Sequence, residues 1–69
     1  MISATATRPA ALWCDRDERY YTHDELVSVF ARYLAVMITN GWDIEVHKLD
    51  DITEENIGHV VYHAEMFNA

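Results

Sequence analysis

The chain has 69 residues, which is enough for one small domain. Its net charge of −7 and its 51% content of hydrophobic residues exclude a disordered acidic tail, and they argue against binding to nucleic acid or to an anionic membrane surface. One cysteine, no leader-like pattern and no apolar stretch long enough to span a bilayer favour a cytoplasmic location.

The first ten residues are predicted to form a flexible arm. Residues 1–10 are rich in Ser, Thr and Ala and contain the one proline of the chain, Pro9. We expect the remainder, residues 11–69, to fold as a single domain.

A β-hairpin is predicted at the start of this domain. Residues 11–14 and 19–21 are short β-favouring runs, and the polar stretch 15–18 between them suits a hairpin loop of four residues. Neighbouring residues in a strand point to opposite faces, so either Tyr20 or Tyr21 is expected to be exposed and available as an interface anchor.

A helix is predicted to follow at once. Thr22 and Glu25 have the spacing of a capping box, and Asn40-Gly41 is typical of a helix end. Apolar residues recur between these limits with helical spacing, which predicts one buried face. The residues of this face are Leu26, Phe30, Tyr33, Leu34, Met37 and Ile38.

Residues 42–47 alternate between apolar and polar side chains, which predicts a half-buried third strand. Its inward residues would be Trp42, Ile44 and Val46. Its solvent-facing residues would be Asp43, Glu45 and His47.

A second helix is predicted from the region 50–55 onward. With Thr53 as N-cap, Ile52 and Ile57 have the spacing of a hydrophobic staple. Gly58 inside this helix costs about 1 kcal/mol relative to Ala, which is tolerable where another element approaches closely. The predicted buried face consists of Ile57, Val60, Val61, Ala64 and Phe67.

Together these elements predict an α+β fold with the order β-β-α-β-α. A small antiparallel sheet of three strands, with both helices packed on one face, would bury every apolar stripe. The strand order stays open, and an all-helical packing with extended arms is the alternative.

The negative charge is concentrated in residues 20–69, where nine acids face only Arg32 and Lys48. Capping and the helix dipole account for about two of the four carboxylates within 50–55, and like charges four residues apart destabilise a helix. The excess predicts an anionic surface that attracts a basic partner, with a merely solvated face as the alternative. The predicted partner-binding residues are Asp43, Glu45, Asp50, Asp51, Glu54 and Glu55, with Tyr20 and Tyr21 as aromatic anchors.

In character, the chain resembles the small acidic anti-CRISPR and DNA-mimic inhibitor proteins that bacteriophages encode. The features that carry the resemblance are the single short domain, the charge excess of residues 20–69 and the cluster Asp50-Asp51 with Glu54-Glu55. The resemblance implies an inhibitor that works without cofactor or catalysis in the host cytosol. Its carboxylates would stand in for phosphates and block the nucleic-acid-binding surface of a CRISPR–Cas effector or another basic defence protein.

Two other classes of protein are alternatives. The first is an accessory subunit or homodimer whose apolar surplus forms the interface, while the charge provides solubility. The second is a small metal-binding protein, because Glu55, His59 and His63 fall on one predicted helix face and imidazole and carboxylate are zinc ligands. The sequence contains no catalytic signature, so we expect a protein that is not an enzyme.

Overall fold

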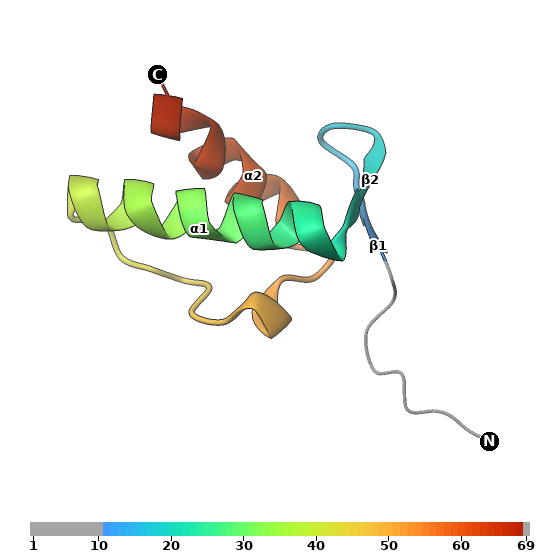
Figure 1. Ribbon diagram of the computed structural model, residues 1–69, viewed down its shortest axis with the longest axis horizontal. Coiled ribbons are helices and arrows are strands. Elements are labelled where there is room, and N and C mark those ends of the chain that lie inside the picture. The colour runs from blue at the N-terminus through green and yellow to red at the C-terminus, as the bar shows by residue number, and fades with distance from the viewer. Residues whose placement is uncertain (1–10, 69) are drawn as a thin grey trace.

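The computed structural model describes residues 11–68, and the predicted arm at 1–10 lies outside this range. A β-hairpin leads into the long helix α1, and an irregular connection then returns beside α1 to the shorter helix α2 (Figure 1). The α+β class is as predicted. Over residues 11–68, no helix combines the length and the apolar character needed to cross a bilayer.

The hairpin forms where the sequence predicts it. Strands β1 (Ala11–Cys14) and β2 (Arg19–Thr22) are antiparallel, and Trp13 lies opposite Tyr20. The loop closes without a glycine because Glu18 adopts a left-handed conformation, with φ at 55°, and donates its N–H to the Cys14 carbonyl at 2.7 Å. A single left-handed residue supplies the reversal that a glycine more often provides.

Helix α1 (His23–Asn40) has both predicted ends. Glu25 N–H donates to the Thr22 hydroxyl at 3.3 Å, and Thr22 N–H donates to the Glu25 carboxylate at 2.9 Å, which completes the capping box. Gly41, with φ at 70°, ends the helix, and Trp42 N–H donates to the Met37 carbonyl at 2.9 Å. This bonding pattern is a Schellman motif.

The buried face of α1 is rotated from the predicted one. Leu26, Tyr33 and Met37 are buried as predicted, whereas Ile38 is 68% exposed. Val29 and Val36 are buried in addition, and the predicted Phe30 and Leu34 are only partly buried. Helical periodicity locates an apolar stripe but does not say which of its edges the neighbouring helix will cover.

The predicted third strand at 42–47 is wrong. The segment is irregular, and the sheet of the described chain has the two strands β1 and β2. At 1.5 Å per residue, the 18 residues of α1 carry the chain about 27 Å away from the hairpin, so this segment begins far from either strand edge. Val46 is buried as predicted, Ile44 is partly buried, and Trp42 stays 46% exposed.

The return to α2 passes through a short 3-10 helix, η2 (Leu49–Asp51), and a turn at 54–56. Thr53 is not the N-cap of the second helix as predicted, because the cap is Asn56. The chain does turn from Thr53 onward, since Ile57 N–H donates to the Thr53 carbonyl at 2.9 Å and Thr53 N–H donates to the Asn56 side chain at 2.8 Å. The first turn is nevertheless irregular, and α2 is regular only over Ile57–Ala64.

Both helices pack on the inward face of the hairpin, where the core residues include Leu12, Cys14 and Tyr21. In α2 the predicted buried residues are confirmed up to Ala64. Phe67 is the exception, because the chain tightens into the 3-10 helix η3 (Glu65–Asn68) and leaves this ring 52% exposed. Arg16 packs over Gly58, but a Cβ at this position would still have an ordinary contact distance of 3.4 Å to the Arg16 Cβ.

Candidate functional site

The predicted carboxylates all lie on one irregular segment, residues 42–56, which we call the acidic connection. It carries six carboxylates and one cation, Lys48, and so holds five of the seven excess negative charges of the chain. It runs along the side of α1 that lies away from the hairpin loop (Figure 1). Each of the six acidic residues is exposed: Asp43, Glu45, Asp50, Asp51, Glu54 and Glu55.

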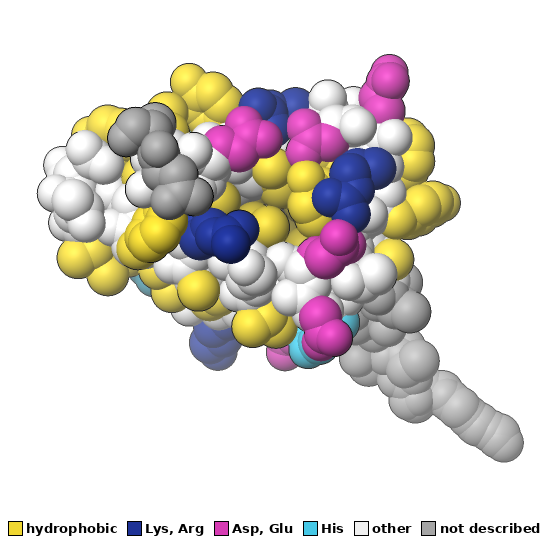
Figure 2. Space-filling model, turned by 45° about the horizontal axis from the view of Figure 1, so that its top comes forward, with side chains coloured by type: hydrophobic (Ala, Val, Ile, Leu, Met, Phe, Trp, Pro, Cys, Tyr) yellow, Lys and Arg dark blue, Asp and Glu magenta, His cyan; other side chains and the backbone are white. Residues whose placement is uncertain are grey.

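The arginines near the hairpin are paired with other carboxylates. Arg16 contacts Asp17 at 2.9 Å and Glu65 at 2.8 Å, and Arg19 contacts Glu25 at 2.6 Å. Basic and acidic side chains lie next to each other on this face of the molecule (Figure 2). The hydrogen bond from the Thr22 backbone, followed by the contact with Arg19, lowers the pKa of Glu25.

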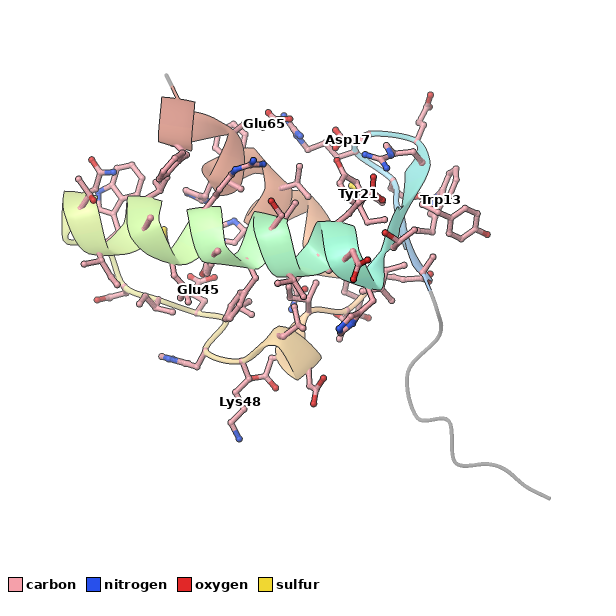
Figure 3. The ribbon with its side chains drawn as sticks, viewed as in Figure 1. Trp13, Asp17, Tyr21, Glu45, Lys48 and Glu65 are labelled. Atoms are coloured by element: carbon pink, nitrogen blue, oxygen red, sulfur yellow. The ribbon has the colours of Figure 1, made fainter. Side chains whose placement is uncertain are left out.

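The acidic connection keeps several carboxylates without a partner. Among residues 11–68, the side chains of Asp43, Asp51 and Glu55 make no hydrogen bond or ion pair. The Glu45 carboxylate lies 3.5 Å from His59 Nε2 and its side chain stays 70% exposed. Figure 3 shows Glu45 and Lys48 on the opposite side of α1 from Glu65.

Glu54 joins the acidic connection to the outer face of the hairpin. Its carboxylate accepts a hydrogen bond from Trp13 N–H at 3.1 Å. The Trp13 ring meets the Tyr20 ring edge to face at 5.0 Å, and Tyr20 is 60% exposed. Trp13 was not among the predicted binding residues; the register of the hairpin places it opposite Tyr20 on the outward face. Glu54 thus contacts the strand that carries the half-buried Trp13 ring, next to the exposed ring of Tyr20.

Of the two tyrosines predicted as candidate anchors, Tyr20 is on this outward face as the exposed one and Tyr21 is not. Only 7% of it is exposed, and its hydroxyl donates to the Asp17 carboxylate at 2.5 Å. The Arg19 guanidinium lies 4.0 Å from the centre of its ring. Burial, followed by the hydrogen bond to Asp17, raises the pKa of Tyr21 to about 12. Its role is to hold the hairpin against the helices.

The metal-ligand set considered as an alternative, Glu55, His59 and His63, is not assembled in the described residues. The two imidazole rings are neighbours, with centroids 4.4 Å apart, but the carboxylate beside them belongs to Glu45. His63 Nδ1 lies 3.1 Å from the His59 carbonyl oxygen, as in an ordinary helix contact. Within residues 11–68, no group of three or more His, Cys, Asp or Glu side chains could hold a metal ion.

Buried Tyr33 fixes the start of the acidic connection. Its hydroxyl accepts hydrogen bonds from the backbone N–H groups of Glu45 and Val46, at 3.1 and 3.3 Å. The side chain is fully buried, so the phenol supplies acceptors where a third strand would otherwise have been needed. The connection is therefore attached to the body through Tyr33 near one end and through Glu54 near the other.

Comparison of the chain with protein-family models, with curated proteins and with solved structures finds no match. The fold and the site define a small α+β protein with an exposed acidic connection.

Proposed function

We propose that the protein is a non-enzymatic inhibitor that binds a basic protein surface through its acidic connection. The proposal depends on one observation. The side chains of Asp43, Asp51 and Glu55 are exposed and have no hydrogen-bond or ion-pair partner within residues 11–68. The fold uses other carboxylates for its contacts with Arg16 and Arg19. Carboxylates that the fold leaves unpaired are free to meet a partner's cations.

The mechanism that fits this surface is mimicry of a nucleic-acid strand. Duplex DNA presents one negative charge per 1.7 Å or so of its axis, and proteins bind it largely through lysine and arginine. The acidic connection presents five excess negative charges within 15 residues. A groove lined with basic residues for nucleic acid would attract this segment, and the bound domain would then block the groove.

Tyr20 and Trp13 supply an apolar contact beside the charges. Aromatic side chains are frequent interface anchors, because they bury a large area at a small cost in conformational entropy. Glu54 of the acidic connection accepts a hydrogen bond from the Trp13 backbone, next to this aromatic pair. The electrostatic field would therefore guide the encounter, and burial of Tyr20 would slow dissociation.

The most specific form of the proposal concerns the target. The chain resembles phage anti-CRISPR and DNA-mimic proteins, so we propose a nucleic-acid-binding protein of host defence, such as a CRISPR–Cas effector, as the partner in the host cytoplasm. The carboxylates would occupy the place of target DNA or guide RNA.

The proposal can be tested by capture and competition. The immobilised full-length chain is incubated with a lysate of its natural host at low salt, and bound proteins are eluted with duplex DNA. The test variant Asp51→Asn/Glu55→Gln neutralises two charges of the acidic connection. The control variant Glu18→Gln/Asp24→Asn removes the same two charge types from the hairpin loop and the start of α1, where both side chains are exposed.

We expect DNA to displace a nucleic-acid-binding protein whose affinity falls at least tenfold with the test variant and less than threefold with the control. Raising the salt concentration from about 0.05 M to 0.3 M should weaken the wild-type complex as well, because it shortens the screening length. A partner that resists both DNA and salt, or that loses equal affinity with both variants, would contradict the proposal.

A homodimer is the second candidate, supported by apolar side chains near the C-terminal ends of the two helices. Ile38 is 68%, Trp42 46% and Phe67 52% exposed. Light scattering of the purified chain separates the two candidates. A dimer that persists unchanged at low and high salt would favour self-association through these side chains, and a monomer would argue against this candidate.

A further inference from the structure

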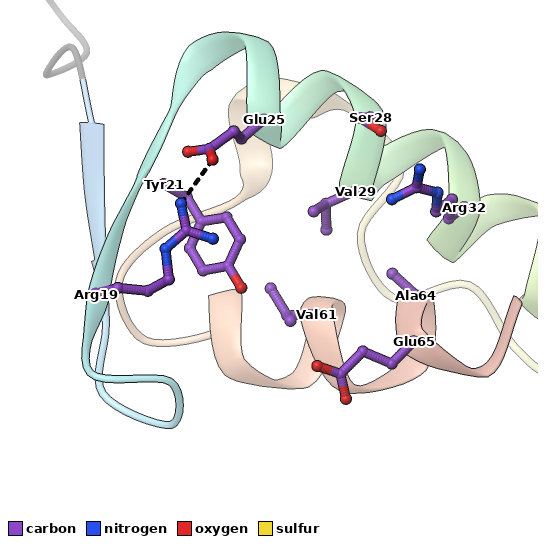
Figure 4. Close-up of a pocket in the computed structure, with 9 residues that line it drawn as sticks. All are labelled: Arg19, Tyr21, Glu25, Ser28, Val29, Arg32, Val61, Ala64 and Glu65. Atoms are coloured by element: carbon purple, nitrogen blue, oxygen red, sulfur yellow. Dashed lines mark hydrogen bonds and ion pairs between the residues drawn. The ribbon is translucent and has the colours of Figure 1, made fainter. Parts of the chain in front are cut away.

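A groove lies between the hairpin and the two helices, away from the acidic connection. Its volume is about 430 Å³, within the range of ligand sites, and it is open on its outer side. Side chains of β2, α1 and α2 all contribute to its wall (Figure 4). Figure 2 shows the hollow as a patch of hydrophobic atoms surrounded by charged side chains.

The floor of the groove is apolar. Val29 comes from α1, and Val61 and Ala64 come from α2, while the ring of Tyr21 closes the end near the hairpin. All four residues are packed into the core and present only small parts of their surfaces. An apolar group of the size of a leucine side chain would find hydrophobic contacts here.

The charged rim contains one guanidinium without a partner. Arg19 is paired with Glu25, and Glu65 is paired with Arg16. Arg32 is exposed, and among residues 11–68 it has no hydrogen-bond or ion-pair partner. In Figure 4 its guanidinium extends from α1 over the space between the helices. The two arginines and two glutamates that line the groove balance in charge, and Arg32 is the lining arginine whose N–H groups no carboxylate of residues 11–68 occupies.

We propose that this groove binds the C-terminal residue of a partner peptide, with an apolar side chain on the floor and the α-carboxylate on Arg32. A guanidinium pairs well with a carboxylate because its parallel N–H groups match the two oxygens. The Ser28 hydroxyl, one helical turn before Arg32, supplies a further donor at the same rim. The open outer side leaves room for the preceding peptide backbone, which keeps its contacts with water.

The apolar floor decides between this ligand and a small inorganic anion. Phosphate or sulfate would contact Arg32 but gain nothing from Val29, Val61 and Ala64. An uncharged apolar molecule would fill the floor and leave Arg32 unpaired. Only a ligand that joins both parts uses the whole groove.

Three small probes separate these contributions in a titration of the isotope-labelled full-length chain followed by NMR. N-acetyl-leucine carries the apolar side chain and the carboxylate, N-acetyl-leucine amide lacks the charge, and acetate lacks the side chain. We expect N-acetyl-leucine to bind with a dissociation constant of about 1–5 mM, which is ordinary for a ligand of this size. The backbone signals of Ser28, Val29, Arg32, Val61 and Ala64 should shift most.

Two variants that each remove one positive charge test whether Arg32 binds the carboxylate of the probe. Arg32→Gln should weaken N-acetyl-leucine binding about tenfold. Lys48→Gln changes the net charge equally on the acidic connection and should leave binding unchanged. Equal binding of the amide, equal binding of inorganic phosphate, signal shifts outside the groove, or an unaffected Arg32→Gln variant would overturn the proposal.

This inference is independent of the proposed inhibitor function. The groove residues lie outside the acidic connection, so Asp51→Asn/Glu55→Gln should bind N-acetyl-leucine as the wild type does. Loss of groove binding in that variant would contradict the separation of the two sites. A failed capture experiment would leave the groove titration unaffected.

Discussion

At the scale of single residues, Tyr33 shows how one side chain can organise a segment without secondary structure. It is fully buried in α1, and its hydroxyl accepts two backbone N–H groups from the acidic connection. Its ring also lies near the rings of His59 and His63, at centroid distances of 6.4 and 6.2 Å. Helical spacing predicts that Tyr33 is buried, but it does not reveal that the hydroxyl serves a remote segment.

Replacing Tyr33 by Phe should destabilise the fold by about 1–3 kcal/mol. The ring stays in the core, but the N–H groups of Glu45 and Val46 lose their acceptor in a poorly solvated place. Urea denaturation measures the loss, and hydrogen exchange should show faster exchange at 45 and 46. The control Tyr62→Phe alters a ring that is 49% exposed and should change stability by less than about 0.5 kcal/mol. An unchanged exchange rate at 45 and 46 would contradict this role.

Tyr21 makes the stability sensitive to alkaline pH. Because burial and Asp17 raise its pKa from 10.0 to about 12, the folded state favours the neutral phenol. The resulting stability is fully present below the unfolded pKa of 10.0 and is lost as pH rises through about 12. Tyr21→Phe should remove most of this decline, and it should cost about 1 kcal/mol at neutral pH through the lost hydrogen bond.

Absorbance titration of tyrosinate, combined with urea denaturation between pH 9 and 12, checks the prediction for Tyr21. The exposed Tyr20 supplies the matched control, since Tyr20→Phe should retain the late ionisation step near pH 12. Loss of that step in Tyr20→Phe, or its retention in Tyr21→Phe, would show that the late ionisation does not belong to Tyr21.

At the scale of elements, the two glycines should respond oppositely to alanine. Gly41 has φ at +70°, so Gly41→Ala should destabilise the end of α1 by about 1 kcal/mol, although there is open space for a Cβ. Gly58 lies inside α2 with ordinary dihedrals, and a new Cβ would meet Arg16 at 3.4 Å. Gly58→Ala should therefore stabilise the protein by about 0.5–1 kcal/mol through helix propensity.

Thermal and urea unfolding of the two alanine variants measures both effects. The bulkier Gly58→Leu serves as a check on the contact, because it must displace the Arg16 side chain and should lower stability. A stabilising leucine would show that the hairpin loop does not press on α2 as described.

The elements that could be predicted from sequence depend on local hydrogen bonds. Thr22 with Glu25 defines the start of α1, and Gly41 defines its end, whatever the rest of the fold does. The alternation at 42–47 was misleading because it reports exposure, whereas a strand also needs a neighbouring strand edge. The segment keeps the inward direction of Val46 but obtains its hydrogen bonds from Tyr33.

The candidate site could also be predicted only in part, because local sequence patterns indicate exposure but not contacts between distant segments. Sequence places six carboxylates on a solvent-facing segment, and each is exposed. It does not show that Glu54 would also cover the edge of β1, because Trp13 and Glu54 are 41 residues apart. Nor does it show that the carboxylate beside His59 would be Glu45 rather than Glu55. These contacts depend on how the connection returns along α1.

At the scale of the whole molecule, the unpaired carboxylates should oppose folding slightly. Like charges on a small domain repel, so neutralising Asp43, Asp51 and Glu55 should stabilise the protein by about 0.5 kcal/mol at low salt. The gain should shrink in about 0.5 M salt, because screening weakens the repulsion in the wild type. Melting temperatures at two salt concentrations measure this. A destabilised triple variant would show that these carboxylates serve the fold instead of a partner.

The way in which the acidic connection is attached has a consequence for adaptation. Tyr33 holds it through backbone N–H groups, which every residue except proline supplies, and so the side chains at Asp43, Glu45 and their exposed neighbours are not constrained by that attachment. Mutations there can alter the shape and charge of the surface while the helices and the hairpin stay intact. Under the proposed inhibitor function, substitutions in this single stretch of chain would let related proteins match a changing partner surface.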